Sequence, residues 1–349
     1  MSQLFARRGV CRWLFLGHNA LSVLTRPLFL TVCLSLPAAT TYAVEPVDAA
    51  VALPSPPRFS AAVTQSYDWD HWNVVGSIRE HRVQGYESLL EIARDYGLGY
   101  HEIVRANPDL DPFLPGAGVK ALIPTARVLP VVPFDQGIVI NLAEKRLYYF
   151  HRQNEKRLVV SFPVGIGTTD ANTPTGDFTI TTKLVNPSWT VPPSIREKRP
   201  YLPAVIPPGP ENPMGSHALQ LSRSSYFIHG THRPWSIGRR ATHGCVRMYP
   251  EDIPILFAMT PPNTPVRIVH QAIKIGWREG AIYIEVHHDK MDDHDGRRWH
   301  DYRAEAEKIL QEKGLEQKID EQKLAEAIRR GQGMAVPIGQ MKQKPNPGE

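Results

Sequence analysis

The pattern of apolar and polar residues divides the chain into stretches that predict different secondary structure. From residue 137 onward, short runs alternate or stay apolar and carry β-branched and aromatic residues, which is typical of strands. These runs are 137–142, 146–151, 157–164, 176–183, 218–221, 226–228 and 266–269. Short strands separated by Gly/Pro turns predict a mainly β domain, either a sandwich or a closed, barrel-like sheet.

Helical spacing of apolar residues is found inside this region and on both sides of it. Residues 250–259 are the one main helix predicted within the β-rich region, with Pro250 at an early position. Upstream, residues 83–124 indicate a small α/β module with the order strand, helix, helix, strand. Its first helix is capped by Ser88 and stopped by Gly97.

The C-terminal part has a third pattern, a hairpin followed by charged helices. Residues 273–277 and 281–286 fit a hairpin, and 299–313 and 319–330 fit charged amphipathic helices. The polar residues 334–349 are predicted to be disordered. The whole chain is therefore divided into an export signal (1–43), a linker (44–80), the small module (81–126), the β-rich domain (133–271) and a partly helical C-terminal extension with a disordered end (272–349).

Residues 1–43 have the features of an export signal. Arginines precede an apolar run at 28–36, and the small residues Thr41 and Ala43 suit cleavage after Ala43. The run is shorter than the ~20 apolar residues that span a bilayer. An uncleaved anchor is the alternative, whereas a lipoprotein is disfavoured because no small residue directly precedes Cys33. We expect an exported, periplasmic protein with no integral membrane span.

Charge and cysteine content narrow the function. The formal charge is +5, but four arginines before residue 44 account for most of it, so nucleic-acid binding gains no support. Cys11 and Cys33 lie in the predicted signal, which leaves Cys245 as the single cysteine of the mature chain. Such a thiol cannot form an internal disulfide and indicates reactivity or pairing with a partner. An inert buried cysteine is the plainer alternative.

Histidines surround this cysteine in the stretch 226–248. A free thiol has a pKa of ~8.5, and a neighbouring imidazole that takes its proton makes it a nucleophile. His243 lies two residues before Cys245, and His229 lies at the end of a predicted strand. A base held on a strand is the better placed of the two for repeated proton transfer.

Neighbouring residues add to this chemistry. Gly230 permits a turn after His229, and Gly244 lets backbone N–H groups converge on an oxyanion. Arg247 offers a bidentate contact to a carboxylate. A zinc site built from His229, His232, His243 and Cys245 is an alternative, although zinc sites usually show tighter paired spacing.

These blocks resemble the L,D-transpeptidase catalytic domain of the YkuD type. The resemblance rests on Ile228-His229-Gly230-Thr231, Ser236-Ile237-Gly238 and Thr242-His243-Gly244-Cys245-Val246-Arg247-Met248, preceded by Thr173-Pro174-Thr175-Gly176 and Asn212-Pro213-Met214-Gly215. One departure is His232, which stands where the family often has Asn and bears on the local loop and on acceptor choice. The small module resembles LysM, a fold that binds N-acetylglucosamine-containing glycans. That likeness rests on Glu87-Ser88-Leu89-Leu90-Glu91-Ile92-Ala93, Ile103-Val104-Arg105-Ala106-Asn107-Pro108 and Leu122-Ile123-Pro124.

The resemblance assigns a role to each site residue and implies no cofactor or metal. The roles are Cys245 as nucleophile, His229 as proton donor and acceptor, the Gly230 carbonyl as orienter of His229, the N–H groups of Gly244 and Cys245 as oxyanion donors, His243 as a lining residue, and Arg247 and Thr231 as substrate contacts.

The function implied is that of an enzyme acting on peptidoglycan. Cys245 forms a thioester with a stem tetrapeptide, D-Ala leaves, and an amine accepts the acyl group. A diaminopimelate amine would give a crosslink, and a lysine of an outer-membrane protein would give wall anchoring. An L,D-carboxypeptidase that uses water, and a non-catalytic protein that binds peptidoglycan, are the alternatives.

Overall fold

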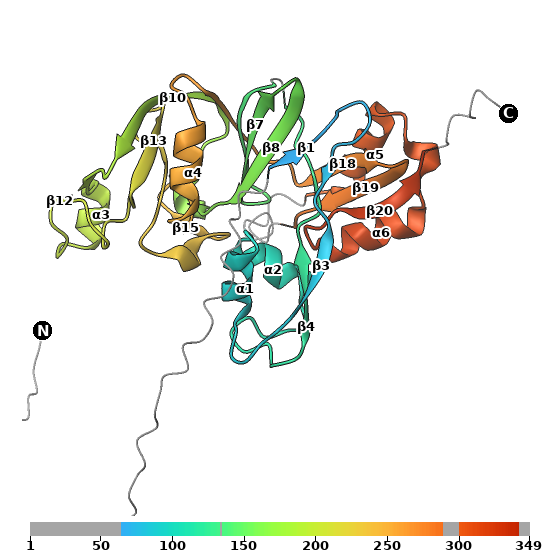
Figure 1. Cartoon of the computed structure of the whole chain (residues 1–349), viewed down its shortest axis with the longest axis horizontal. Coiled ribbons are helices and arrows are strands. Elements are labelled where there is room, and N and C mark those ends of the chain that lie inside the picture. Colours follow the sequence, from blue (N-terminus) through green and yellow to red (C-terminus); the bar gives the residue numbers. More distant parts are fainter. Residues whose placement is uncertain (1–63, 133–134, 289–299, 342–349) are drawn as a thin grey trace, which may run out of the picture. The chain divides into compact units, whose positions relative to one another are not determined.

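A computed structural model describes residues 64–132, 135–288 and 300–341 of the chain (Figure 1). The predicted signal with Cys11 and Cys33, most of the predicted linker and the last eight residues lie outside the described residues. Everything described belongs to one compact unit. Within it, no helix combines the length and the apolar character needed to cross a membrane.

The helices are short. In chain order they are α1 (Leu89–Asp95), α2 (Tyr100–Ala106), α3 (Pro193–Lys198), α4 (Asp252–Met259), α5 (Tyr302–Glu312) and α6 (Glu321–Arg330). The main predicted helix is thus present as α4, but it begins at residue 252, after Pro250 and the cap residue Glu251.

A nine-stranded sheet forms the β-rich domain and confirms its predicted class. In spatial order its strands are β1 (Gln65–Ser66), β8 (Lys156–Pro163), β7 (Arg146–Gln153), β6 (Gly137–Asn141), β17 (Pro265–Val269), β10 (Gly176–Val185), β13 (His217–Leu221), β14 (Phe227–His229) and β16 (Val246–Arg247). Most neighbours are antiparallel, but β6 pairs with β17, and β14 with β16, in parallel. The first pair joins segments that are distant in sequence, and the second joins strands separated by residues 230–245.

The sheet curls until its two ends meet. After β8 the chain continues into β9 (Ile166–Gly167), which pairs with β15 (Arg240–Thr242). Gly165, which lies between β8 and β9, exchanges backbone hydrogen bonds of 2.9 and 2.8 Å with Arg247 of β16. The continuation of β8 is therefore bonded to β16 at the opposite end of the sheet. This is the closed form of the two predicted architectures.

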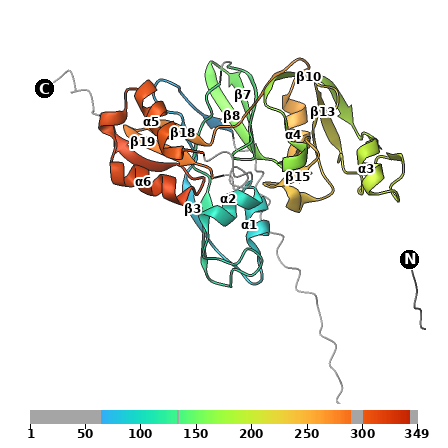
Figure 2. The ribbon, with the colours of Figure 1, turned by 180° about the vertical axis from the view of Figure 1, so that it is seen from behind.

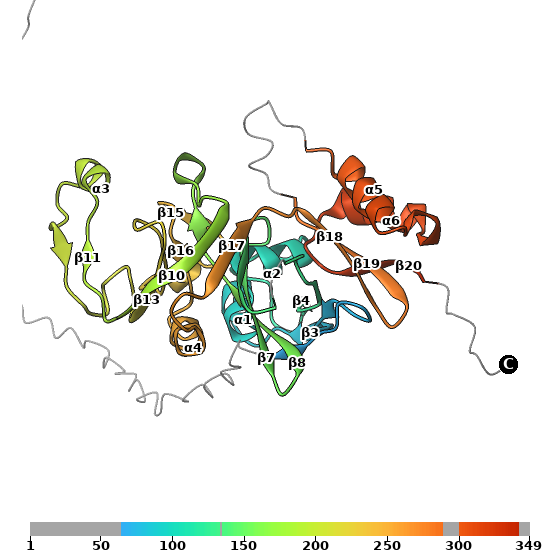
Figure 3. The same ribbon diagram turned by 90° about the horizontal axis from the view of Figure 1, so that it is seen from above.

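Apolar side chains fill the inside of this curl. Buried residues of β6, β7, β8, β13 and β17 form one cluster with Ile253 and Leu256 of α4, which lies against β13. Figure 3 shows α4 beside β13 and β10, and shows α3 and β11 (Trp189–Thr190) in the excursion between β10 and β13. This excursion also contains β12 (Val205–Ile206), which pairs with β11.

The small module has the predicted order of elements but begins earlier. Its first strand is β3 (Ile78–Arg82), antiparallel to β4 (Lys120–Pro124), so residues 78–80 belong to the module and not to the linker. Ser88 caps α1 in a capping box with Glu91. The linker prediction is also wrong for residues 64–77. There β1 joins the large sheet, and β2 (Val74–Val75) pairs with β5 (Arg127–Val128).

A buried ion network joins the module to the large sheet. Glu102 of α2 accepts hydrogen bonds from the guanidinium of Arg146 on β7, at 3.0 Å from both Nε and Nη2. Arg127 lies 3.0 Å from the same carboxylate, and the N–H of Gly99 donates to it at 2.7 Å. The nearby arginines outweigh burial and lower the pKa of Glu102. The carboxylate is thus charged and fully partnered inside the protein.

The C-terminal extension is a three-stranded sheet covered by two helices. β18 (Ile273–Arg278), β19 (Ala281–Val286) and β20 (Val336–Gln340) are antiparallel neighbours, and α5 and α6 pack on them (Figure 2). Disorder was predicted from residue 334, but β20 pairs with β19 there. The strand was missed because Gly and Pro interrupt its apolar pattern.

A second buried network ties the extension to the β-rich domain. Lys274 Nζ lies 2.8 Å from Glu144 and 3.1 Å from Glu285, and it donates to the Val128 carbonyl at 2.5 Å. His287 contacts Glu285 at 2.6 Å, and burial lowers the pKa of His287 to about 3, so the ring is neutral. Lys274 is therefore the cation that compensates two buried carboxylates.

We predict that Lys274→Met lowers the free energy of unfolding by about 3–5 kcal/mol, because it leaves two buried carboxylates without their cation. Lys308→Met is the matched control. Lys308 forms an exposed pair with Glu312 at 3.9 Å, and its loss should cost about 1 kcal/mol or less. Chemical denaturation measures both variants. Equal effects would show that the Lys274 network adds no more than a surface pair.

Candidate active site

The parallel pairing of β14 with β16 brings the two halves of the predicted site together. His229 lies opposite Arg247 in this register, and the backbone N–H of Met248 donates to the His229 carbonyl at 2.8 Å. Cys245 directly precedes β16. The base predicted on a strand and the predicted nucleophile therefore come from adjacent segments of one sheet.

Thr242 holds the turn that carries the nucleophile. Its buried hydroxyl accepts the N–H of Gly244 at 3.1 Å and donates to the carbonyl of Cys245 at 2.6 Å. Gly244 has φ +107°, and a Cβ there would lie 2.8 Å from the ring of Tyr226. Glycine is required at this position because both the backbone conformation and the space exclude a side chain.

These bonds bear on one sequence-based assignment, which stays a prediction. The N–H of Gly244 was expected to serve as an oxyanion donor, but it is already bonded to Thr242. Within the described residues, the N–H of Cys245 donates to no acceptor. At rest, the Cys245 N–H is therefore the backbone donor of this turn that has no acceptor among the described residues.

The thiol of Cys245 is half-buried and protonated at rest. Its sulfur donates to the carbonyl of Ser225 at 3.7 Å. Burial raises the pKa of the thiol, and the Phe227 N–H and the Arg247 charge offset this only in part. In this state the thiol is bonded to Ser225 and has no hydrogen bond to His229.

His229 is buried and held in one tautomer. Its Nδ1 lies 2.7 Å from the carbonyl of Gly230, and since a carbonyl only accepts, Nδ1 carries the proton. Nε2 is therefore the unprotonated nitrogen. Burial, with the Arg247 charge, lowers the pKa of His229 to about 3, while the carbonyls of Gly230, Met214 and Pro213 act in the opposite direction. At neutral pH the site holds a thiol and a neutral imidazole.

The other predicted residues surround this pair with different exposure. His243 is exposed, and burial together with nearby cations lowers its pKa. Thr231 is buried, and its hydroxyl accepts the N–H of Arg233 at 3.0 Å. His232 is half-buried, and its Nδ1 has no partner in the described part of the chain.

Arg247 keeps unused donor capacity beside the cysteine. Its Nη1 donates to the Ala241 carbonyl at 3.2 Å, whereas its buried Nε has no acceptor in the described residues. Burial lowers the pKa of Arg247, although an arginine remains charged at neutral pH. A positive charge with a free N–H group thus lies next to the nucleophile.

The zinc alternative has no convergent ligand set. Over the described residues, His, Cys, Asp and Glu ligand atoms come together in threes only at Glu144, Glu285 and His287. That group already holds Lys274. No such group of three ligand atoms forms among His229, His232, His243 and Cys245.

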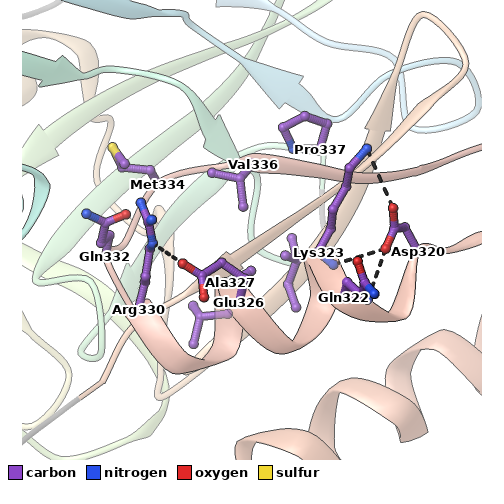
Figure 4. Close-up of a pocket in the computed structure, with 12 residues that line it drawn as sticks. Asp320, Gln322, Lys323, Glu326, Ala327, Arg330, Gln332, Met334, Val336 and Pro337 are labelled. Atoms are coloured by element: carbon purple, nitrogen blue, oxygen red, sulfur yellow. Dashed lines mark hydrogen bonds and ion pairs between the residues drawn. The ribbon is translucent and has the colours of Figure 1, made fainter.

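A cavity of about 530 Å³ lies elsewhere, in the C-terminal extension. Figure 4 shows Met334, Val336 and Pro337 on one side of it and the α6 residues Lys323, Glu326 and Arg330 on the other. No predicted site residue lines it.

Sequence reasoning missed Thr242 and the backbone groups that contact the sulfur. A threonine two residues before a glycine is a signal for a side-chain-bonded turn and would have indicated Thr242. The Ser225 carbonyl and the Phe227 N–H have no such signal, because any residue supplies them.

Comparisons with known proteins agree with the motifs. The model of the L,D-transpeptidase catalytic domain (YkuD) matches residues 135–268. The chain is 40% identical over 233 residues to the probable L,D-transpeptidase YcfS of Escherichia coli strain K12, a match that covers 63% of this chain and 72% of that protein. It is 38% identical over 238 residues to the probable L,D-transpeptidase YbiS of the same strain, covering 65% and 76%. The solved Enterococcus faecium L,D-transpeptidase C442S mutant is 17% identical with a TM-score of 0.30, covering 39% of this chain and 50% of that one.

The raised thiol pKa predicts how the free enzyme reacts with iodoacetamide. Alkylation of Cys245 should increase with pH and reach half its maximum above the ~8.5 of an ordinary thiol. Mass spectrometry of the predicted mature chain, which lacks Cys11 and Cys33, measures this between pH 6 and 10, with Cys245→Ser as the unlabelled control. Full reactivity already at pH 6 would instead indicate a resting thiolate paired with imidazolium.

Proposed function

The chain belongs to the L,D-transpeptidase family, and we propose that it is an exported cysteine transpeptidase acting on peptidoglycan stem tetrapeptides. The observation that carries this proposal is the placement of Cys245 and His229 on neighbouring segments, with the imidazole fixed in the tautomer that accepts a proton at Nε2. A thiol and a base so placed are what acyl transfer through a thioester needs.

The first half of the reaction forms the acyl-enzyme. The Cys245 thiol gives its proton to Nε2 of His229 as the sulfur attacks the carbonyl before the terminal D-Ala. The oxyanion that develops accepts a hydrogen bond from the Cys245 N–H. The C–N bond then breaks, His229 returns the proton to the leaving amine, and D-Ala departs. The carbonyl of Gly230 keeps the ring oriented and stabilises the transient imidazolium.

The second half resolves the thioester. An acceptor amine gives a proton to His229 and attacks the thioester carbonyl, and the sulfur leaves as a thiol. A diaminopimelate amine gives a crosslink, and a lysine of an outer-membrane protein gives wall anchoring. Water in place of the amine gives an L,D-carboxypeptidase, which is the second candidate because it shares the same acyl-enzyme.

Cationic groups at the site support an anionic donor. Arg247 has an unpartnered buried N–H group beside Cys245. Lys198 and Arg199 of the α3 excursion also act on His243, where they help to lower its pKa. Carboxylates of a stem peptide match this charge, and Arg247 with Thr231 supplies the substrate contacts.

Exposed apolar residues support glycan binding by the small module. Tyr86 is 95% exposed and Phe113 is 60% exposed, although large apolar side chains are normally covered. Leu114 is exposed beside Phe113. We infer that this surface binds glycan strands and holds the enzyme on its polymeric substrate in the periplasm.

Cys245→Ala should abolish D-Ala release and the mass increase of the acyl-enzyme, because no other thiol is present in the predicted mature chain. His229→Gln should lower the rate of D-Ala release by about 10²–10⁴-fold, the range for loss of a general acid–base. Incubation with purified muropeptides followed by mass spectrometry reports acyl-enzyme, crosslinks and hydrolysis together.

His270→Gln is the control for this experiment, since His270 is exposed and lies outside the site. Turnover retained by Cys245→Ala would reject the mechanism. Hydrolysis products without crosslinks would favour the carboxypeptidase. Binding without any acyl-enzyme would favour a non-catalytic wall protein.

The glycan proposal has its own test. Tyr86→Ala combined with Phe113→Ala should lower the amount of protein that sediments with insoluble peptidoglycan at least several-fold, because both exposed ring surfaces are removed. Val131→Ala is the matched control, as Val131 is 63% exposed outside the module. Unchanged sedimentation of the double variant would leave the module without this role.

A further inference from the structure

The turn between α1 and α2 of the small module meets the loop that leads to the nucleophile. Gly99 and Gly238 touch through their backbones. A Cβ built on Gly99 would lie 2.6 Å from Gly238 Cα, and one built on Gly238 would lie 2.3 Å from the Tyr100 nitrogen. Gly238 also has φ +78°. The contact is thus possible only because both positions lack a side chain.

Directional interactions fix this contact. The N–H of Tyr100 donates to the Ile237 carbonyl at 3.1 Å, and the guanidinium of Arg239 lies 3.3 Å from the centre of the Tyr100 ring. On its other side, the Gly238 N–H donates to the Val164 carbonyl at 3.1 Å. The loop is therefore held between the module and the closing edge of the large sheet.

The same turn also holds the chain beyond the nucleophile. The hydroxyl of Tyr249 donates to the Leu98 carbonyl at 3.1 Å. Nearby, Arg94 of α1 binds Glu251 with two hydrogen bonds of 2.7 and 2.8 Å. The segment 240–248, which contains Thr242 and Cys245, is consequently anchored to the module at both of its ends.

Buried charged groups hold the turn between α1 and α2 in place. Glu102 accepts the Gly99 N–H, and Arg146 donates to the Gly97 carbonyl at 2.6 Å while it binds Glu102. Movement of this turn would disturb a buried ion network. It is therefore a fixed support and not a passing contact.

We propose that Gly99 and Tyr100 are positioning residues for the nucleophile, so that the module acts in catalysis independently of any glycan that it binds. This inference rests on the proposed thioester chemistry at Cys245. The turn sets the two ends of segment 240–248 and thereby the position of the Cys245 thiol and N–H relative to His229. A reacting group displaced by ~1 Å costs up to about 100-fold in rate.

The test uses a soluble tetrapeptide donor without sugars, so that glycan binding contributes nothing. Gly99→Ala in the full chain should lower kcat for D-Ala release by about 10- to 100-fold, with KM for the donor nearly unchanged. Gly85→Ala is the matched control in the same module. It also has a positive φ (+54°) and loses some stability, but a Cβ there meets no atom within 4 Å, so kcat should stay at the wild-type value.

A second variant keeps the test independent of folding. Tyr100→Pro removes the N–H that bonds Ile237, yet proline is favoured at the first position of a helix, so α2 should form. It should lower kcat as Gly99→Ala does, and Tyr100→Phe, which keeps the ring and the N–H, should restore it. Thermal unfolding midpoints identify any variant whose loss of activity is only a loss of fold.

The outcomes separate this inference from the proposed function. If the wild type releases no D-Ala from the donor, the proposed function fails. If the wild type and Gly85→Ala are active and folded Gly99→Ala or Tyr100→Pro keeps kcat within twofold of them, the positioning role alone is overturned. A change confined to KM, or seen only on polymeric peptidoglycan, would overturn it as well.

Discussion

The parallel pairing of β14 with β16 is the constraint on which the site depends. These two short strands bring His229 beside Arg247 and place Cys245 directly before the last strand of the sheet. The hydrogen bonds between Gly165 and Arg247 then close the sheet around them. A parallel pair needs a crossover connection, and here the crossover is the loop that contains Gly238. The geometry of the base and the nucleophile thus follows from the closure of the sheet.

Much of the fold was predictable because its signals are local. Alternating or continuous apolar residues located β6, β7, β8, β10, β13, β14 and β17, whereas the two- and three-residue strands β9, β11, β12, β15 and β16 were missed. Ser88 and Gly97 marked the ends of α1 as the structure has them. The parallel pairs were not predictable, since periodicity gives a strand but not its partner. The linker prediction failed at residues 64–77 because β1 and β2 are only two residues long, too short to show a period. It failed at residues 78–80 because β3 is mostly polar and exposed there.

The candidate site was predictable as a set of residues more than as a geometry. Cys245 and His229 were identified because a lone thiol near imidazoles is a chemical signal in the sequence. Their states at rest depend on burial, which sequence does not give, and so the raised thiol pKa and the neutral ring required the structure. The hydrogen bond from the Gly244 N–H to the Thr242 hydroxyl was not predicted for a related reason, because it forms only in the folded turn.

The burial of Glu102 has a consequence for how this chain is built. The ion pairs of Glu102 with Arg146 and Arg127 form only while the module and the sheet are packed together. Unfolding of either part breaks these bonds, so the module and the sheet share part of their stability.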